Sequence, residues 1–169
     1  MPDGIIAASY FLHMVATVVW VGGITLLTLI VYPSVRKTLS GDDPLKRTLI
    51  SEIHRRFSPL AMLSLATLIV TGLAQMAVNP NYNGLLKIDN AWGWAILFKH
   101  LAFGLMALLG AYSVWGLTPA ITRLALLDSR GKLSGGESIS LRRREERLNR
   151  FNFALALIVL ALTAIARAV

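Results

Sequence analysis

Four long apolar stretches dominate this 169-residue chain, and they constrain its fold more than any other feature. An α-helix rises about 1.5 Å per residue, so roughly 20 apolar residues cross a bilayer core about 30 Å thick. Short connections between the stretches make neighbouring helices antiparallel. The sequence therefore predicts an all-α integral membrane protein, a single transmembrane domain built as an up-down four-helix bundle. The predicted spans cover about residues 5–32, 57–78, 92–117 and 151–169, the first of them closed by Pro33.

The composition supports this fold class. Hydrophobic residues make up 55% of the chain and charged residues only 15%, whereas roughly one quarter of a soluble domain is charged. A short amphipathic helix is expected before the second span, because apolar residues recur at every fourth position among lysines and arginines. These apolar residues are Leu45, Leu49, Ile53 and Phe57.

The basic residues cluster on alternate connections between the spans. Residues 33–56 contain six lysines and arginines and residues 118–150 contain eight, but residues 79–91 contain only one. The positive-inside rule therefore predicts a multi-pass protein of a bacterial-type inner (cytoplasmic) membrane, with both termini outside. Nucleic acid is not an expected partner despite the net charge of +8, since the basic clusters flank the spans.

The residue inventory limits the chemistry. The chain has no cysteine, which excludes disulfides, thiolate metal sites and covalently attached c-type haem. No Ser-His-Asp set, carboxylate pair or glycine-rich phosphate loop is present, so hydrolysis and phosphoryl transfer are not expected. Any metal would have to be held by histidine, methionine, carboxylate or backbone oxygen.

Two histidines are predicted to lie at the same depth in the bilayer. His13 and His100 each lie eight residues from the outer end of their span, which is about 12 Å below the surface. Imidazoles on two facing helices suit the opposite faces of a haem b, and they equally suit a copper ion with histidine and methionine ligands. Met14 and Met106 are the candidate methionines. In the simpler alternative, each histidine only hydrogen-bonds to a neighbouring helix.

Lys99 and Trp20 are further candidates at this site. Lys99 directly precedes His100, and adjacent side chains differ by about 100° around a helix, so the two compete for the inward direction. Pairing with a haem propionate explains a lysine at this depth better than exposure to lipid does. Trp20 lies seven residues after His13 on the same helix face, where it would pack either against a macrocycle or within the core.

Two other polar features have simpler interpretations. Polar residues at intervals of three and four form a stripe along the second span, expected to hydrogen-bond between helices, with a proton- or quinone-facing path as the alternative. His54 is followed by two arginines and is expected to be a solvated residue at the interface. The stripe consists of Ser64, Thr67, Thr71 and Gln75.

Motifs in all four spans resemble those of the copper resistance protein D (CopD) family. The first span contains Leu12-His13 and then Trp20-Val21-Gly22-Gly23, similar to the Leu-His and Trp-x-Gly-Gly of that family. The other motifs are Arg55-Arg56-Phe57-Ser58, Leu97-Phe98-Lys99-His100-Leu101 and Arg147-Leu148-Asn149-Arg150.

The pattern is also similar to that of the HemJ-type protoporphyrinogen oxidases, four-span proteins associated with haem b. In that family a first-span histidine and a third-span lysine form the functional pair, and by motif these fall on His13 and Lys99. The chain lacks the glutamate that HemJ-type proteins carry after Asn149, which brings it closer to CopD.

These features favour a membrane redox protein. Haem b would lie between the first and third spans in the outer half of the bilayer, with His13 and His100 as its metal ligands. Trp20 would contact the cofactor, and Lys99 would be the catalytic residue. Electrons would pass from a porphyrin or quinol to a quinone or a protein partner.

Two alternatives to haem redox chemistry remain open. The first is a copper-handling or import protein with a His/Met site, which the lack of Met-x-x-Met or cysteine pairs disfavours. The second is a non-catalytic accessory subunit of a larger membrane complex. The sequence does not decide whether the chain forms a homo-oligomer.

The charge distribution yields a prediction of topology. A cysteine introduced at Asn83 should react from outside intact cells with an impermeant thiol reagent, whereas one at Ser134 should react only after the membrane is opened. The chain has no native cysteine, so each labelled thiol is unambiguous. Labelling of Ser134→Cys in intact cells would contradict the predicted orientation.

Overall fold

A computed structural model describes residues 3–39, 44–82, 84, 88, 90–128 and 136–168, most of which are helical. Four helical segments are long and apolar enough to cross a membrane, which confirms the predicted fold class of four helical spans. These segments are Asp3–Thr38, Thr48–Ala77, Ala91–Leu124 and Ser140–Ala168. The labelling positions Asn83 and Ser134 lie outside the described residues.

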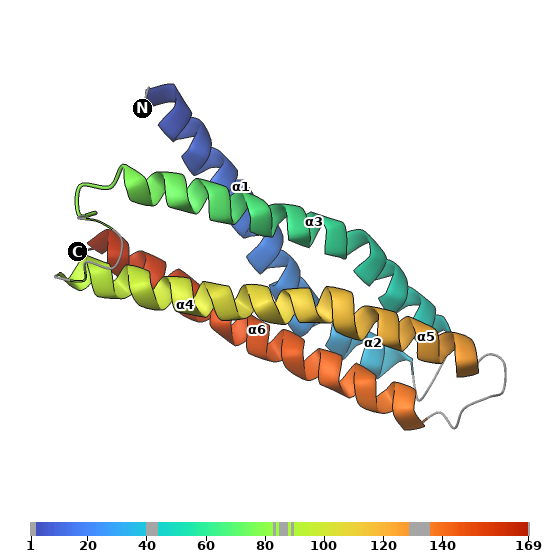
Figure 1. The fold of residues 1–169 in the computed structure, drawn as a ribbon. Helices are drawn as coiled ribbons and strands as arrows, with labels where there is room; N and C mark the ends of the chain where they lie inside the picture. Colours follow the sequence, from blue (N-terminus) through green and yellow to red (C-terminus); the bar gives the residue numbers. More distant parts are fainter. Residues whose placement is uncertain are drawn as a thin grey trace.

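The helices run up and down along the molecule. Their order is α1 (Asp3–Leu26), the π-helical turn η1 (Leu27–Val31), α2 (Tyr32–Thr38), α3 (Pro44–Ala77), α4 (Ala91–Tyr112), the π-helical turn η2 (Ser113–Leu117), α5 (Thr118–Asp128) and α6 (Gly136–Ala168). The start of α1, the end of α3, the start of α4 and the end of α6 lie at one end, which we call the terminal end (Figure 1). The opposite end, which holds α2 and α5, is called the basic end.

The first and third spans are longer than predicted, because proline does not end them. The helix passes through Pro33 to Thr38, and η1 ends two residues before this proline. A proline ring normally clashes with the preceding turn and lacks an N–H donor, and a wide π-helical turn provides the room that it needs. The same arrangement recurs where η2 precedes Pro119, and there the helix continues to Asp128.

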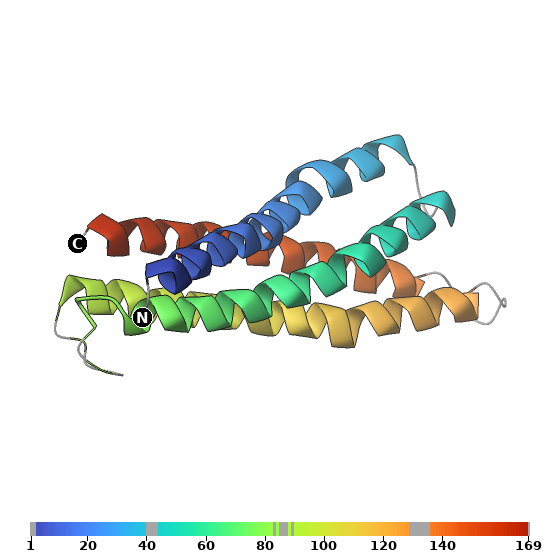
Figure 2. The same cartoon turned by 90° about the horizontal axis from the view of Figure 1, so that it is seen from above.

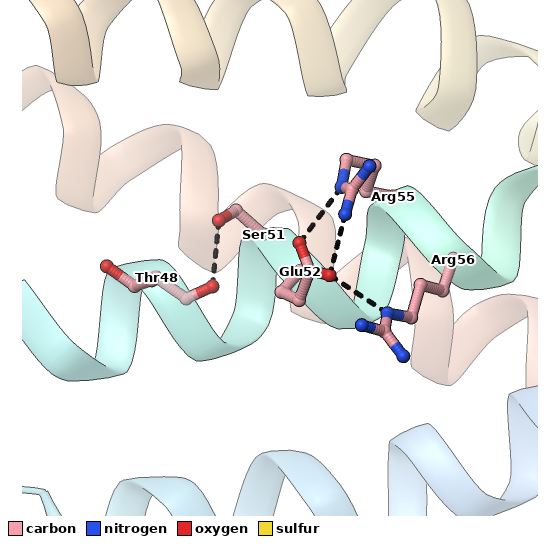
Figure 3. A network of polar contacts seen from close by, with 5 residues as sticks. All are labelled: Thr48, Ser51, Glu52, Arg55 and Arg56. Carbon is pink, nitrogen blue, oxygen red and sulfur yellow. Dashed lines mark hydrogen bonds and ion pairs between the residues drawn. The ribbon is translucent and has the colours of Figure 1, made fainter.

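The predicted amphipathic helix is present, but it forms one continuous helix with the second span. At 34 residues, α3 is about 51 Å long, which exceeds a bilayer core of about 30 Å, so its first turns extend beyond the core at the basic end. On this extension Glu52 accepts hydrogen bonds of 2.8 and 2.9 Å from Arg55 and one of 2.9 Å from Arg56 (Figure 3). Ser51 donates to the Thr48 carbonyl one turn earlier (Figure 3). The fourth span likewise begins early, in the basic stretch of α6.

The bundle consists of two helix pairs, α1 with α3 and α4 with α6. Figure 2 shows the same helices from above, running lengthwise beside one another. The pairs meet where α1 and η1 contact α6. Trp20 and Met106 are almost fully buried in the core at 2% and 1% exposure. A Cβ at Gly110 would lie 3.1 Å from Trp20 Cη2, so this glycine leaves room for the indole ring to reach across to α4.

Candidate metal-binding cavity

A cavity of about 960 Å³ lies toward the terminal end and is lined by residues of α1, α3, α4 and α6. His13, Lys99 and His100 all line it, so the fold brings together the three residues singled out for their depth. Trp20 is not among the lining residues, because its ring is enclosed in the core. The predicted contact of Trp20 with a cofactor therefore finds no counterpart in this geometry.

The His13 ring is held by a hydrogen bond to the neighbouring helix α3. Its Nδ1 lies 2.8 Å from Thr71 Oγ1, and this hydroxyl donates its only hydrogen to the Thr67 carbonyl at 2.6 Å. Thr71 must therefore accept from His13, which places the ring hydrogen on Nδ1. The lone pair of Nε2 stays free to bind a ligand, as in histidine ligands oriented by an outer partner.

His100 has the same tautomer for a different reason. Its Nδ1 lies 2.7 Å from the Ile96 carbonyl one turn earlier, and a carbonyl oxygen only accepts. Neither His13 nor His100 has a hydrogen-bond partner for Nε2 within the part of the chain that the structure describes. The two rings differ in burial, since His13 is half-buried and His100 is exposed.

Three methionines from three different helices also line the cavity. They are Met14 of α1, Met76 of α3 and Met106 of α4. The sequence singled out Met14 and Met106, whereas Met76 carried no recognisable signal. Among the described residues no group of three His, Cys, Asp or Glu could hold a metal ion, so a site here would combine imidazole with thioether ligands.

The cavity has a positive lining. Lys99 and Arg167 both line it, and none of the described residues around it is an aspartate or glutamate. The Arg167 guanidinium lies over the Tyr10 ring, 5.7 Å from its centroid. Sequence reasoning missed Arg167, which lies two residues from the outer end of the predicted last span and therefore nearer the surface than the predicted depth of the two histidines.

The polar stripe of α3 joins this helix to α1. Gln75 Nε2 donates to the Ser9 carbonyl at 3.2 Å, and Thr71 accepts from His13 as described above. Thr67 instead bonds within its own helix, to the Leu63 carbonyl. Interhelical hydrogen bonding, the expected role of the stripe, therefore holds for its outer half.

The expectation of a solvated His54 is wrong. Its side chain is only 13% exposed, and its Nε2 lies 2.8 Å from the hydroxyl of Tyr32. Its Nδ1 lies 3.4 Å from Glu145 Oε1. The next residues, Arg55 and Arg56, are exposed and suggested a solvated position, but the step of about 100° between residues turns His54 toward the bundle.

The sequence model of the copper resistance protein D family matches residues 51–166, more than half of the chain. The matched region includes Lys99 and His100, whereas His13 precedes it. The chain is also 32% identical over 108 residues to the copper transport protein CutJ of Bacillus subtilis (strain 168). That alignment covers 60% of this chain but 17% of the relative, so the chain spans only a small part of its length. No solved structure matches the chain.

The hydrogen-bond chain through Thr71 predicts the tautomer of His13. In ¹⁵N NMR spectra of histidine-labelled protein, His13 should carry its hydrogen on Nδ1, and Thr71→Val should abolish this preference by removing the acceptor. Thr67→Val is the matched control, because the carbonyl of residue 67 still orients Thr71. A wild-type His13 ring protonated on Nε2 would contradict the geometry.

Proposed function

Since the chain belongs to the copper resistance protein D family, we propose that this multi-pass membrane protein binds copper in the cavity and handles it as cargo. One observation carries the proposal: two imidazoles and three thioethers line one cavity. Thioether and imidazole are ligands that suit Cu(I). The Bacillus subtilis relative is named a copper transport protein, which agrees with this proposal.

The fold removes the objection that the sequence raised against copper. The chain has no Met-x-x-Met pair, which disfavours a relay of thioether ligands along one helix. In the bundle, single methionines on α1, α3 and α4 line the same cavity as His13. Copper handling therefore ranks above the haem-based redox chemistry that the sequence favoured.

Each group in the cavity has a distinct role in this proposal. His13, held by Thr71, is the ligand whose orientation is fixed before copper arrives. Met106 supplies a buried thioether, and the exposed His100 supplies a second imidazole. Lys99 and Arg167 repel a cation, so they keep its binding weak enough for release.

The central test measures Cu(I) binding by purified protein in detergent, in competition with a chromogenic Cu(I) chelator. His13→Ala should weaken binding at least about tenfold, because it removes the oriented ligand, and His100→Ala should weaken it less. His54→Gln is the matched control, a histidine substitution at the opposite end of the bundle. Wild-type affinity in His13→Ala, with helix content retained, would overturn the assignment of His13.

Haem b is the second candidate, and the positive lining of the cavity favours it. His13 and His100 would bind the iron, and the Lys99 and Arg167 side chains would pair with the propionates. The group would supply one-electron chemistry, with a quinone or protein partner as acceptor. A sharp α-band in the visible spectrum of the dithionite-reduced protein would select this candidate. A colourless protein with stoichiometric copper would select copper handling.

Substitution of Lys99 separates the two candidates by the sign of its effect. For copper, Lys99→Met removes a repelling charge and adds a thioether, so Cu(I) affinity should rise several-fold. For haem, the same change removes a propionate partner, so haem retention should fall. Both quantities can be measured on one preparation. If neither Cu(I) affinity nor haem retention changes, Lys99 has no role at the site, and this result favours the accessory-subunit alternative.

A further inference from the structure

A second buried polar group lies at the basic end, away from the copper cavity. It consists of Tyr32 at the start of α2, His54 of α3, and Glu145 and Asn149 of α6. The Tyr32 hydroxyl lies 2.8 Å from His54 Nε2 and 2.7 Å from Asn149 Nδ2. His54 Nδ1 lies 3.4 Å from Glu145 Oε1, and the Glu145 side chain is only 6% exposed. Along α1 and η1, Tyr32 is about 28 Å from His13, so this is a separate site.

Donor and acceptor chemistry connects these four side chains in one direction. The Asn149 amide can only donate through Nδ2, so the Tyr32 oxygen accepts from it. The Tyr32 hydroxyl hydrogen is then available to His54 Nε2, and His54 Nδ1–H faces the Glu145 carboxylate. This series of hydrogen bonds starts at Asn149 and ends at Glu145, both on α6, and passes through α2 and α3. It therefore joins helices that belong to different pairs of the bundle.

A π-helical turn, η1, lies directly beside this cluster. Tyr32 is the residue at which η1 ends, and its backbone N–H bonds to the Leu27 carbonyl. π-helical turns shift the register of the residues that follow and often occur at functional sites. A change in η1 would carry the Tyr32 hydroxyl away from His54 and Asn149, because α2 continues from that turn as a short helix of seven residues.

We propose that Tyr32, His54, Glu145 and Asn149 form a latch that closes the basic end of the bundle while the cavity holds copper at the terminal end. This inference rests on the proposed function, since a cargo protein needs one closed end. The core around Trp20 and Met106 separates the two sites. Copper leaves toward the basic end only after the latch opens. Opening leaves buried polar groups unpaired unless water enters, so the latch has two states, closed and hydrated.

The test uses a cysteine at Val35, a residue of α2 that is 8% exposed and lies one turn after Tyr32. In an otherwise cysteine-free chain, the rate of thiol labelling at Val35→Cys reports opening of the basic end. Adding Tyr32→Phe, which removes only the hydroxyl, should raise this rate roughly three- to tenfold. Tyr112→Phe is the matched control, since the Tyr112 ring is 41% exposed and contacts the Arg144 guanidinium at 5.4 Å. Equal rates for Tyr32→Phe and Tyr112→Phe would overturn the latch.

Two additional measurements keep the result decisive. Glu145→Gln preserves the shape of the side chain and should also accelerate labelling, so it replaces Tyr32→Phe if that variant loses helix content. Cu(I) affinity should stay within about twofold of wild type in either variant, because the cavity is about 28 Å away. If the wild type binds no copper, the proposed function fails, and the labelling rates still decide whether the latch exists. If copper binds and the rates do not change, only the latch fails.

Discussion

Hydrogen-bond satisfaction in the bilayer is the constraint on which the rest of this structure depends. Lipid offers no partners to backbone N–H and C=O groups, so a spanning segment is a helix whose bonds close within itself. This requirement explains why Pro33 and Pro119 each follow a π-helical turn and do not end their helices. It also explains why polar side chains of the spans bond either within their own helix, as Thr67 does, or to the neighbouring helix, as Gln75 does. Thr71 serves its own helix through the Thr67 carbonyl and the neighbouring helix through His13.

The same constraint gives the bundle two polar regions with different chemistry. At the terminal end, His13 and His100 use one ring nitrogen each for the protein and leave the other free, in a cavity with a positive lining. At the basic end, both nitrogens of His54 have partners, and a carboxylate is present. An imidazole with a free nitrogen suits a ligand, whereas one engaged on both sides suits a structural connection. Apolar core separates these regions.

The presence of four helical spans was readable in the sequence, because each is a long apolar stretch. Counting residues along the predicted helices also singled out His13, His100 and Lys99, and all three line one cavity. The sequence did not reveal how α3 continues through its amphipathic start, because the end of a helix depends on its surroundings and hydropathy does not report them. Met76 and Arg167 were missed since isolated residues of these types have no periodicity, and only the packing of four helices places them at the cavity. His54 was misjudged because its sequence neighbours are exposed while its own face of α3 is buried. The residues that line the cavity come from four helices, so no single sequence motif contains them.

The pairing of α1 with α3 and of α4 with α6 divides the chain into two consecutive helical hairpins. This division has a consequence for biosynthesis. The first hairpin contains both His13 and Thr71. The His13 imidazole can therefore form its hydrogen bond once this hairpin is inserted, before the second hairpin is present. The cavity itself needs side chains from both hairpins and therefore comes into existence only when they associate. If the hairpins insert in order, the His13–Thr71 contact is therefore available before the cavity is complete.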